Sequence, residues 1–508
     1  MRPEVPACRA DLLRVPEGEL PPPGGVTYRS RGRVAVIGDD AAAAGVAMAL
    51  AAGRAVVAVA PGLARPRSAP DTLEVVDAAA ERVDGWLGAF RVALEGGTSP
   101  VEADVVLDLR RRALLERSVL PFGYVATRGH AIALEAAVDV ALQWTGVFHK
   151  PKYFSYTPSI CAHESHGLTG CTRCLDVCGA RAIRSKGTVV EVEPHLCQGC
   201  AACALACPTG ALSVAAPTRT ELLADAQAAI DAAGGRATLH VVEAGASAPA
   251  DATVVHTPAI ATFGEELWLA SLALGAQRVV LHARDPLAPE TRELLEQQRE
   301  VANGVALALG FGPEAVVWAD AAGVDVTPAP RRDLVPAAAV PLPANERKRD
   351  FLNQALARLE PDGGIGAMPL PAGAPLGTIV VDASACVMCG VCAQACPTAS
   401  IRFFEGDARA TLDFVEGHCV QCGLCARLCP EHAITLQPRL ASARERQAWR
   451  TLSASPLAAC PGCGARFIAQ ALLDSMLRKA AAAGVSDAMR EQMRRCPSCR
   501  HASANVRC

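Results

Sequence analysis

The chain has 508 residues, too many for a single hydrophobic core, and this length predicts about three or four domains. Hydrophobic residues make up 51% and charged residues 20%, as in folded globular proteins, and the formal net charge of −3 gives no general attraction to nucleic acids or anionic membranes. The N-terminus shows no apolar signal region, and the alanine-rich residues 41–60 contain Arg54, so neither secretion nor a membrane span is expected. The 22 cysteines are therefore expected in a reducing cytoplasm, where metal ligation is favoured over disulfide formation.

Strand and helix patterns alternate over residues 30–148 and predict an α/β domain. Strands are expected at residues 33–38, 54–60 and 103–109, and helices at residues 40–51 and 131–145. The turn after the first strand carries Gly38, but Asp40 and Ala43 stand where a dinucleotide-binding turn requires its second and third glycines. We therefore expect a degenerate Rossmann-like domain that retains neither FAD nor NAD.

A second α/β domain is predicted over residues 218–330. Helices are expected at residues 220–235, 265–274 and 289–309, the last of them long. Strands are expected at residues 237–243, 252–258, 277–283 and 315–320. Residues 331–377 follow as a proline-rich linker that contains one helix.

Four segments repeat one cysteine pattern. Three of them, beginning at Cys197, Cys386 and Cys419, read C-x2-C-x2-C-x3-C-P, and none of the cysteines lies between Cys207 and Cys386. The fourth is a variant in which Leu168 stands where the first cysteine is expected. Each segment continues into an apolar residue and a strand-like run, which predicts a repeated unit of cysteine loop, helical turn and strand.

This spacing favours [4Fe–4S] clusters over zinc, because three close cysteines wrap one cubane while the fourth reaches the cluster of the partner segment. Two interlocked modules follow, module 1 at residues 158–216 and module 2 at residues 378–438, each with two clusters. The predicted ligands are Cys161, Cys171, Cys174 and Cys207 for cluster 1; Cys197, Cys200, Cys203 and Cys178 for cluster 2; Cys386, Cys389, Cys392 and Cys429 for cluster 3; and Cys419, Cys422, Cys425 and Cys396 for cluster 4.

Cluster 1 is the least regular of the four. Because Leu168 cannot ligate iron, Cys161 is the expected replacement, with His163 or His166 as alternatives. A three-iron cluster or an open iron position is a further alternative on the sequence. Gly179 also replaces the usual proline in this segment.

The tail, residues 439–508, is expected to be a basic helical segment with a zinc-ribbon-like knuckle pair. Two CPxC pairs, Cys460 with Cys463 and Cys496 with Cys499, can supply the four thiolates of a structural zinc site. A rubredoxin-like single iron and redox-active thiols are the alternatives. The excess of basic residues in the tail is compatible with a solvent-exposed helix face or with docking to an acidic protein. We assign no role to Cys8 or Cys508.

The two cysteine modules closely resemble bacterial two-cluster ferredoxins, which implies low-potential transfer of single electrons. The segment CAHESHGLTGCTRCLDVC at residues 161–178, together with the CPGCG and CPSCR pairs of the tail, resembles 4Fe–4S proteins associated with formate dehydrogenase. A more distant resemblance is to the large flavin and iron–sulfur subunit of heterodisulfide reductases, with residues 236–320 similar to the hydrogenase delta subunit but without its cysteines.

These resemblances imply an electron-transfer subunit, or polyferredoxin, that exchanges electrons with redox partner proteins such as a formate dehydrogenase. No nucleophile–base pair or catalytic carboxylate pair stands out, so we expect a carrier without a substrate site of its own. The alternatives are a flavin-dependent oxidoreductase subunit of the heterodisulfide reductase type and an accessory or assembly protein for a dehydrogenase.

Overall fold

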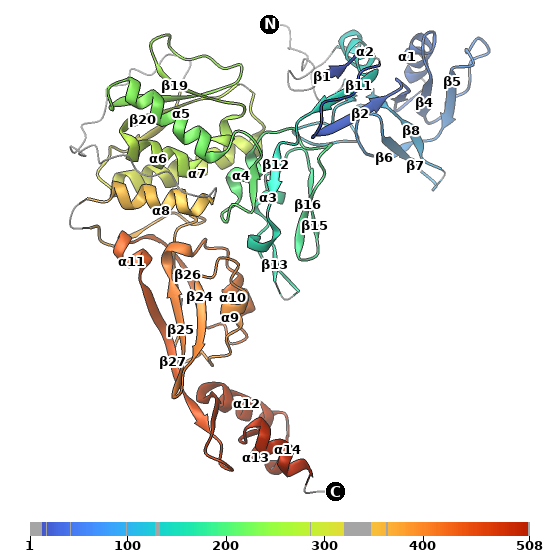
Figure 1. Cartoon of the computed structure of the whole chain (residues 1–508). Coiled ribbons are helices and arrows are strands. Elements are labelled where there is room, and N and C mark those ends of the chain that lie inside the picture. Colours follow the sequence, from blue (N-terminus) through green and yellow to red (C-terminus); the bar gives the residue numbers. More distant parts are fainter. Residues whose placement is uncertain are drawn as a thin grey trace.

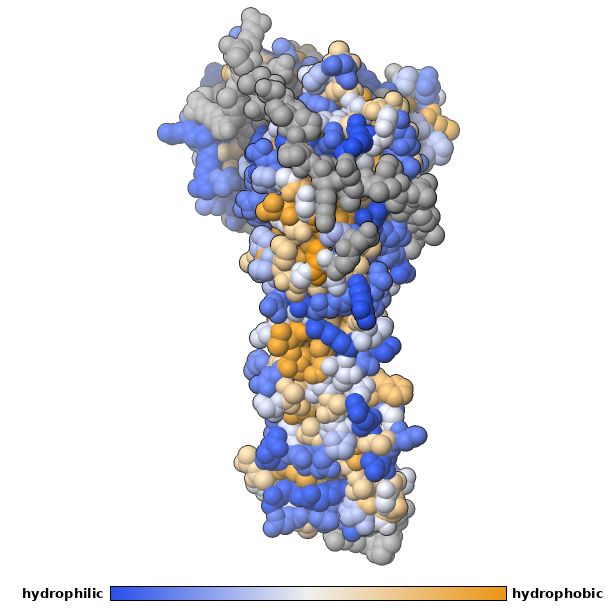
Figure 2. Space-filling model, turned by 90° about the vertical axis from the view of Figure 1, so that its left-hand side faces the viewer, coloured by the Kyte–Doolittle hydropathy of each residue, from blue (hydrophilic) through white to orange (hydrophobic). Residues whose placement is uncertain are grey.

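A computed structural model describes residues 13–505 with gaps at residues 17, 41, 98, 128–132, 166, 285, 320–346 and 362–363. Cys8, His166 and Cys508 lie outside the described residues. Figure 1 shows two α/β lobes at the top, module 1 between them, module 2 below, and the C-terminal helices at the lower end. The space-filling view in Figure 2 shows a broad upper part and a narrower lower part, with hydrophobic patches (orange) separated by hydrophilic surface (blue).

The first lobe is built on a parallel sheet with strand order β10–β9–β3–β4–β5. These strands are β3 (Val34–Ile37), β4 (Val56–Ala60), β5 (Leu73–Asp77), β9 (Val105–Asp108) and β10 (Tyr124–Ala126). Every residue of β3, β4 and β9 is buried, as in a parallel sheet covered on both faces. Helices α1 (Ala42–Ala51) and α2 (Leu134–Gln143) lie where helices were predicted.

Two further sheets of this lobe were not predicted. Strands β6 (Ala80–Asp84), β7 (Phe90–Leu94) and β8 (Val101–Ala103) form an antiparallel sheet, and β1 (Leu13–Val15), β11 (Gly146–Lys150) and β2 (Val26–Ser30) form another. Strand β11 ends at Lys150, directly before module 1, so this second sheet leads the chain toward the cysteine loops.

The second lobe has the parallel strand order β19–β18–β20–β21. Its elements are α5 (Arg219–Ala232), β18 (Ala237–Glu243), β19 (Thr253–Thr257), the short 3-10 helix η2 (Ile260–Thr262), α6 (Glu265–Leu274), β20 (Ala276–His282), α7 (Pro289–Ala308) and β21 (Val316–Trp318). All seven predicted strands and helices are present within a few residues of their expected ends. Helix α8 (Lys348–Leu359) packs on α6 and shares its core with Leu205 of module 1, so lobe and module form one packed unit.

Module 1 contains three short antiparallel strand pairs around its cysteine loops. Its strands are β12 (Phe154–Tyr156), β13 (Glu164–Ser165), β14 (Leu168–Thr169), β15 (Ile183–Lys186), β16 (Val189–Val192) and β17 (Leu212–Val214), and its helical turns are η1 (Pro158–Ile160), α3 (Arg173–Asp176) and α4 (Ala202–Ala206). The turns α3 and α4 pack against each other, as expected for two interlocked segments.

Module 2 has the same plan with a larger sheet. Its strands are β22 (Met368–Pro369), β23 (Gly377–Val381), β24 (Ile401–Glu405), β25 (Arg409–Val415) and β26 (Ile434–Leu440), and its helical turns are α9 (Val391–Gln394), η3 (Glu416–His418), α10 (Leu424–Leu428) and α11 (Ala443–Gln447).

The expectation of a helical tail is only partly right. Strand β27 (Trp449–Ala459) pairs antiparallel with β25 and so extends the sheet of module 2 before β28 (Arg466–Ala469) turns back on it. Helices α12 (Gln470–Ala482), α13 (Asp487–Met493) and α14 (Pro497–Asn505) then complete the tail. Among the described residues, none of the helices is long and apolar enough to cross a bilayer.

Candidate metal centres

The three complete cysteine loops share one backbone conformation. The residues two and four places after the first cysteine have a left-handed backbone, which curls the chain so that successive cysteines face one centre. These residues, with their φ angles, are Gly199 (74°) and Ala201 (63°), Met388 (58°) and Gly390 (74°), and Gln421 (53°) and Gly423 (79°). Glycine occupies three of the six positions, where the absence of a Cβ removes the steric cost of this conformation.

The last cysteine of each segment is also held in a repeated way. Three residues after it, a left-handed residue turns the chain, and a following backbone amide donates a hydrogen bond to the cysteine sulfur. The amide-to-sulfur distances are 3.2 Å for Ala182 to Cys178, 3.4 Å for Leu212 to Cys207, 3.3 Å for Ser400 to Cys396 and 3.3 Å for Ala433 to Cys429. Such donors stabilise negative charge on sulfur and would tune the potential of a bound cluster.

Module 1 brings its cysteines together in two groups. Burial raises the pKa of Cys174, and the neighbouring Cys207, Cys171 and Cys161 add to the effect. Burial likewise raises the pKa of Cys203, with contributions from Cys200, Cys197 and Cys178. Cys161, Cys171 and Cys207 are thus close to Cys174, and Cys178, Cys197 and Cys200, together with Cys174, are close to Cys203.

Module 2 repeats this grouping. Burial raises the pKa of Cys392 to about 12, and the charges of Cys389, Cys386 and, more weakly, Cys429 contribute. Burial also raises the pKa of Cys425, with Cys419, Cys422 and Cys396 as its strongest thiol neighbours. Several thiolates in such a setting repel one another unless a metal compensates their charge, so the residues present fit a cluster of iron.

Cys161 and His163 have different surroundings. Cys161 follows η1 and hydrogen-bonds with the hydroxyl of Tyr156, beside Cys174. His163 is buried, and both of its ring nitrogens have partners: Nδ1 lies 3.0 Å from the carbonyl of Cys171 and Nε2 lies 2.8 Å from the Ser185 hydroxyl. His163 is therefore bonded to the loop of Cys171, whereas the Cys161 thiol lies near Cys174.

Gly179, which replaces the usual proline, packs closely against another part of the chain. A Cβ on this residue would overlap the hydroxyl oxygen of Ser118, which belongs to the first lobe. The variant segment thus lies directly against the first lobe, and a side chain at this position would require the Ser118 hydroxyl to move.

A buried cation lies behind one loop in each module, and no sequence pattern indicated either of them. Lys150 is fully buried between the rings of Tyr28, Phe122 and Tyr153, and its ammonium donates to the carbonyl oxygen of Cys197. Arg349 in α8 donates to the carbonyl oxygens of Gly417 (2.9 Å), Pro375 (3.0 Å) and Cys419. Burial lowers the pKa of Arg349 to about 10, which still leaves it charged at neutral pH.

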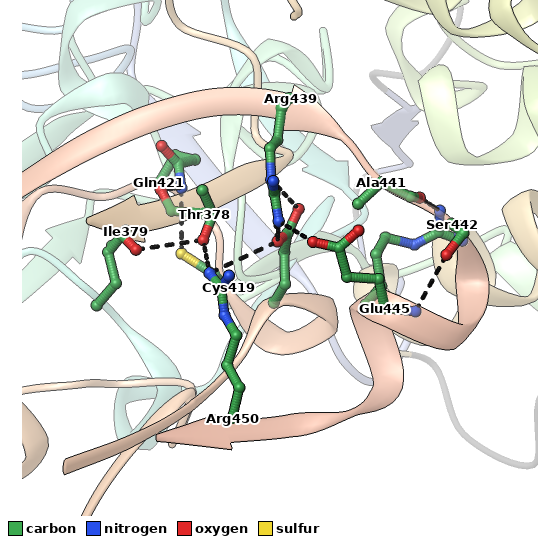
Figure 3. A network of polar contacts seen from close by, with 11 residues as sticks. Thr378, Ile379, Cys419, Gln421, Arg439, Ala441, Ser442, Glu445 and Arg450 are labelled. Carbon is green, nitrogen blue, oxygen red and sulfur yellow. Dashed lines mark hydrogen bonds and ion pairs between the residues drawn. The ribbon is translucent and has the colours of Figure 1, made fainter. Parts of the chain in front are cut away.

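Cys419 also lies in the polar network that Figure 3 shows. The Gln421 side-chain amide donates to the Cys419 sulfur at 3.3 Å and to the carbonyl of Thr378 at 3.0 Å, which fixes the loop to β23. Nearby, the Arg439 guanidinium forms an ion pair with Glu416, N to O 2.6 Å, and thereby holds β26 against η3. The loop is thus supported from several elements of module 2.

The two modules meet at their cysteine loops. Burial raises the pKa of Cys171, and after Cys207 the next thiol that contributes is Cys422 of module 2. Beside them, a Cβ on Gly170 would lie 2.5 Å from a methyl carbon of Leu424. Arg427 donates to the Thr169 carbonyl at 2.7 Å. Clusters 1 and 4 would therefore be neighbours across this junction.

The four tail cysteines converge on one point. The ligand atoms of Cys460, Cys463, Cys496 and Cys499 all lie within 4.8 Å of one another. The Cys496 amide donates to the Cys460 sulfur at 3.3 Å and, together with other local amides, lowers the pKa of Cys460 to about 6. Four sulfurs at this spacing can surround one metal ion tetrahedrally.

Comparison with known protein families agrees with this chemistry. Residues 379–436 match a family described as a 4Fe-4S dicluster domain, and residues 189–212 match a family described as a 4Fe-4S binding domain. No curated protein matches the chain. The protein therefore carries ferredoxin-type domains, binds [4Fe–4S] clusters and has a role in electron transfer.

Proposed function

We propose that the protein passes single electrons along a row of four [4Fe–4S] clusters, held by the four ligand sets assigned above, in the order cluster 2, cluster 1, cluster 4, cluster 3. Within each module the exchanged fourth cysteine keeps the two clusters close together. The observation that carries the proposal is the junction between the modules, where Leu424 lies against Gly170 and Arg427 donates to the Thr169 carbonyl oxygen. That contact makes the two modules one path instead of two separate carriers.

Cys161 is our assignment for the fourth ligand of cluster 1. Its sulfur interacts with Cys174, and His163 already uses both ring nitrogens in other hydrogen bonds. For the tail we assign one zinc ion to its four cysteines, because four thiolates at tetrahedral spacing form a closed structural site.

We infer that the first lobe is a degenerate Rossmann-like domain without a bound dinucleotide. Its strand order is that of dinucleotide-binding sheets. Asp39 follows Gly38 at the turn where a pyrophosphate would bind, and its carboxylate accepts hydrogen bonds from the Arg111 amide at 2.8 Å and the Arg110 side chain at 3.2 Å. These bonds lower the pKa of Asp39 and hold its carboxylate within the turn.

The electron donor or acceptor that we propose is a formate dehydrogenase in the cytoplasm. This proposal rests on the resemblance of residues 161–178 and of the tail cysteine pairs to proteins associated with that enzyme. The basic residues of the tail are the part of the chain that we expect to contact an acidic partner protein.

The test is anaerobic purification followed by metal and sulfide analysis and electron paramagnetic resonance. Four cubanes predict about sixteen irons and sixteen sulfides per chain, and reduction should give spectra broadened by interaction between neighbouring clusters. Formate together with a formate dehydrogenase should reduce them. About eight irons, or four clusters with no magnetic interaction between modules, would contradict the proposed row.

A further inference from the structure

A cavity of about 660 Å³ lies between module 1 and the second lobe. One wall is the loop of cluster 2, including Cys197, Cys200 and Cys203. The opposite wall comes from the carboxyl ends of the parallel strands: Glu243 ends β18, and Arg284 follows β20. This volume includes space beside the three cysteines where cluster 2 would sit, and it lies within the range of small-molecule and cofactor sites.

The topology of the second lobe makes this position a preferred ligand site. In the order β19–β18–β20–β21, the chain leaves β18 toward one edge of the sheet and leaves β20 toward the other. The loops after these two strands therefore diverge and leave a crevice between them, which is where open α/β sheets bind ligands. Glu243 and Arg284 lie at this crevice, and the Arg284 amide donates to the Glu243 carboxylate at 2.9 Å.

We propose that this cavity binds a phosphorylated flavin, with its phosphate toward Arg284 and its ring toward the loop of cluster 2. The inference rests on the cluster assigned to Cys178, Cys197, Cys200 and Cys203, because a ligand beside a one-electron centre must accept electrons singly. Flavins do so, whereas nicotinamides exchange hydride.

The lining suits the two ends of such a ligand. Lys152 and Arg284 are cationic and Glu243 is the single carboxylate among the described lining residues, so the balance favours an anion. Near the cysteine loop the wall is apolar or aromatic, with Tyr153 and Ile260. Helix α7 begins just beyond Ala288 on the same rim, and its N-terminus adds partial positive charge.

The test is equilibrium dialysis of the anaerobic, iron-loaded protein against flavin mononucleotide or riboflavin, with bound flavin measured after acid release. The two probes share a ring, and only the first carries a phosphate. We expect riboflavin to bind roughly tenfold more weakly or worse, since it forms no charge-assisted hydrogen bond to Arg284. Arg284→Gln should weaken binding of flavin mononucleotide by about the same factor and leave riboflavin unchanged.

A control variant completes the experiment. Arg299→Gln, further along α7 and paired with Glu296, should leave binding of both probes unchanged. Equal affinities for the two probes, no binding, or an Arg284→Gln protein that binds flavin mononucleotide normally would overturn the assignment. Iron analysis on the same sample separates the causes: full iron without flavin binding refutes only the flavin site, whereas absent iron refutes the proposed function and the flavin site with it.

Discussion

Lys150 and Arg349 hold equivalent positions in the two modules, although they come from unrelated elements. Each donates to the carbonyl oxygen of the first cysteine in a complete loop, Cys197 for the lysine and Cys419 for the arginine. A fixed positive charge beside a cluster favours its reduced form, because reduction adds one negative charge. We therefore expect these two cations to raise the potentials of clusters 2 and 4.

Replacing either cation should lower the potential of its own cluster. Arg349→Gln removes the charge near Cys419, and we expect a shift of cluster 4 on the order of tens of millivolts toward more negative potential. Lys150→Met should do the same for cluster 2, so each variant is the control for the other. The measurement is a redox titration followed by electron paramagnetic resonance. Arg349→Lys should restore most of the potential, and a shift in both modules from one variant would contradict a local charge effect.

Cys161 can be tested against His163 directly. Cys161→Ala should leave cluster 1 with three protein ligands, and we expect it to lose one iron, leaving about fifteen per chain and a three-iron signal in the oxidised protein. His163→Gln should retain about sixteen irons, because the histidine only positions the loop. The reverse pattern, with iron lost on changing His163 and kept on changing Cys161, would identify the histidine as the ligand.

At the scale of elements, the second lobe was predictable and the strands beside module 2 were not. Strand β18 and helix α6 have the predicted ends because their apolar runs and periodicity are local signals. Strand β27 has no such signal: its sequence WRTLSASPLAA contains Pro456 and several small residues, and pairing with β25 and β28 specifies it. The short charged strands of the first lobe, such as β6, escaped prediction for the same reason.

The cysteine groups were predictable because their spacing is itself a coordination pattern. The exchange of the fourth cysteine is predicted from the repeated segment and stays a prediction, although Cys178 is near Cys203 and Cys396 is near Cys425. Contacts between segments far apart in the chain carry no comparable signal. Neither the meeting of Gly170 with Leu424 nor the cation Arg349 behind Cys419 could be inferred from sequence.

The tail site makes an independent prediction at this scale. Cys499→Ser should remove one zinc per chain and unfold the packing of α14 against the turn between β27 and β28, because structural zinc sites contribute folding energy directly. Iron content and visible absorption should stay unchanged, since β27 remains paired with β25. Metal analysis and limited proteolysis check both points. Loss of iron together with zinc would mean that the four tail cysteines support module 2.

At the scale of the whole molecule, the lobes support the loops of the proposed row of clusters. The first lobe supplies Lys150 and contacts Gly179, and the second lobe packs its core against Leu205 and supplies Arg349 through α8. Figure 1 shows the result: module 1 lies between the two lobes, and module 2 lies below it. The orientation of the modules is thus fixed by packing outside the cysteine loops.

The contact between the modules gives the prediction that concerns the entire path. Gly170→Ala would place a methyl group 2.5 Å from both the Ala162 carbonyl oxygen and a Leu424 methyl carbon, so the loop of cluster 1 must move away from module 2. We expect the magnetic interaction between clusters 1 and 4 to weaken and electron exchange between modules to slow, with about sixteen irons retained. Gly304→Ala, on α7 with open space around its Cβ position, is the matched control.

Rapid freezing after substoichiometric reduction measures this exchange. In the native protein and in the Gly304→Ala control, electrons should distribute among all four clusters according to potential, whichever module receives them first. In Gly170→Ala they should stay longer in the module that was reduced, because electron transfer depends steeply on the separation that Gly170 keeps short. Unchanged distribution times in Gly170→Ala at full iron content would mean that electrons cross between modules by another route, and that the contact at Thr169 and Arg427 serves only to hold them together.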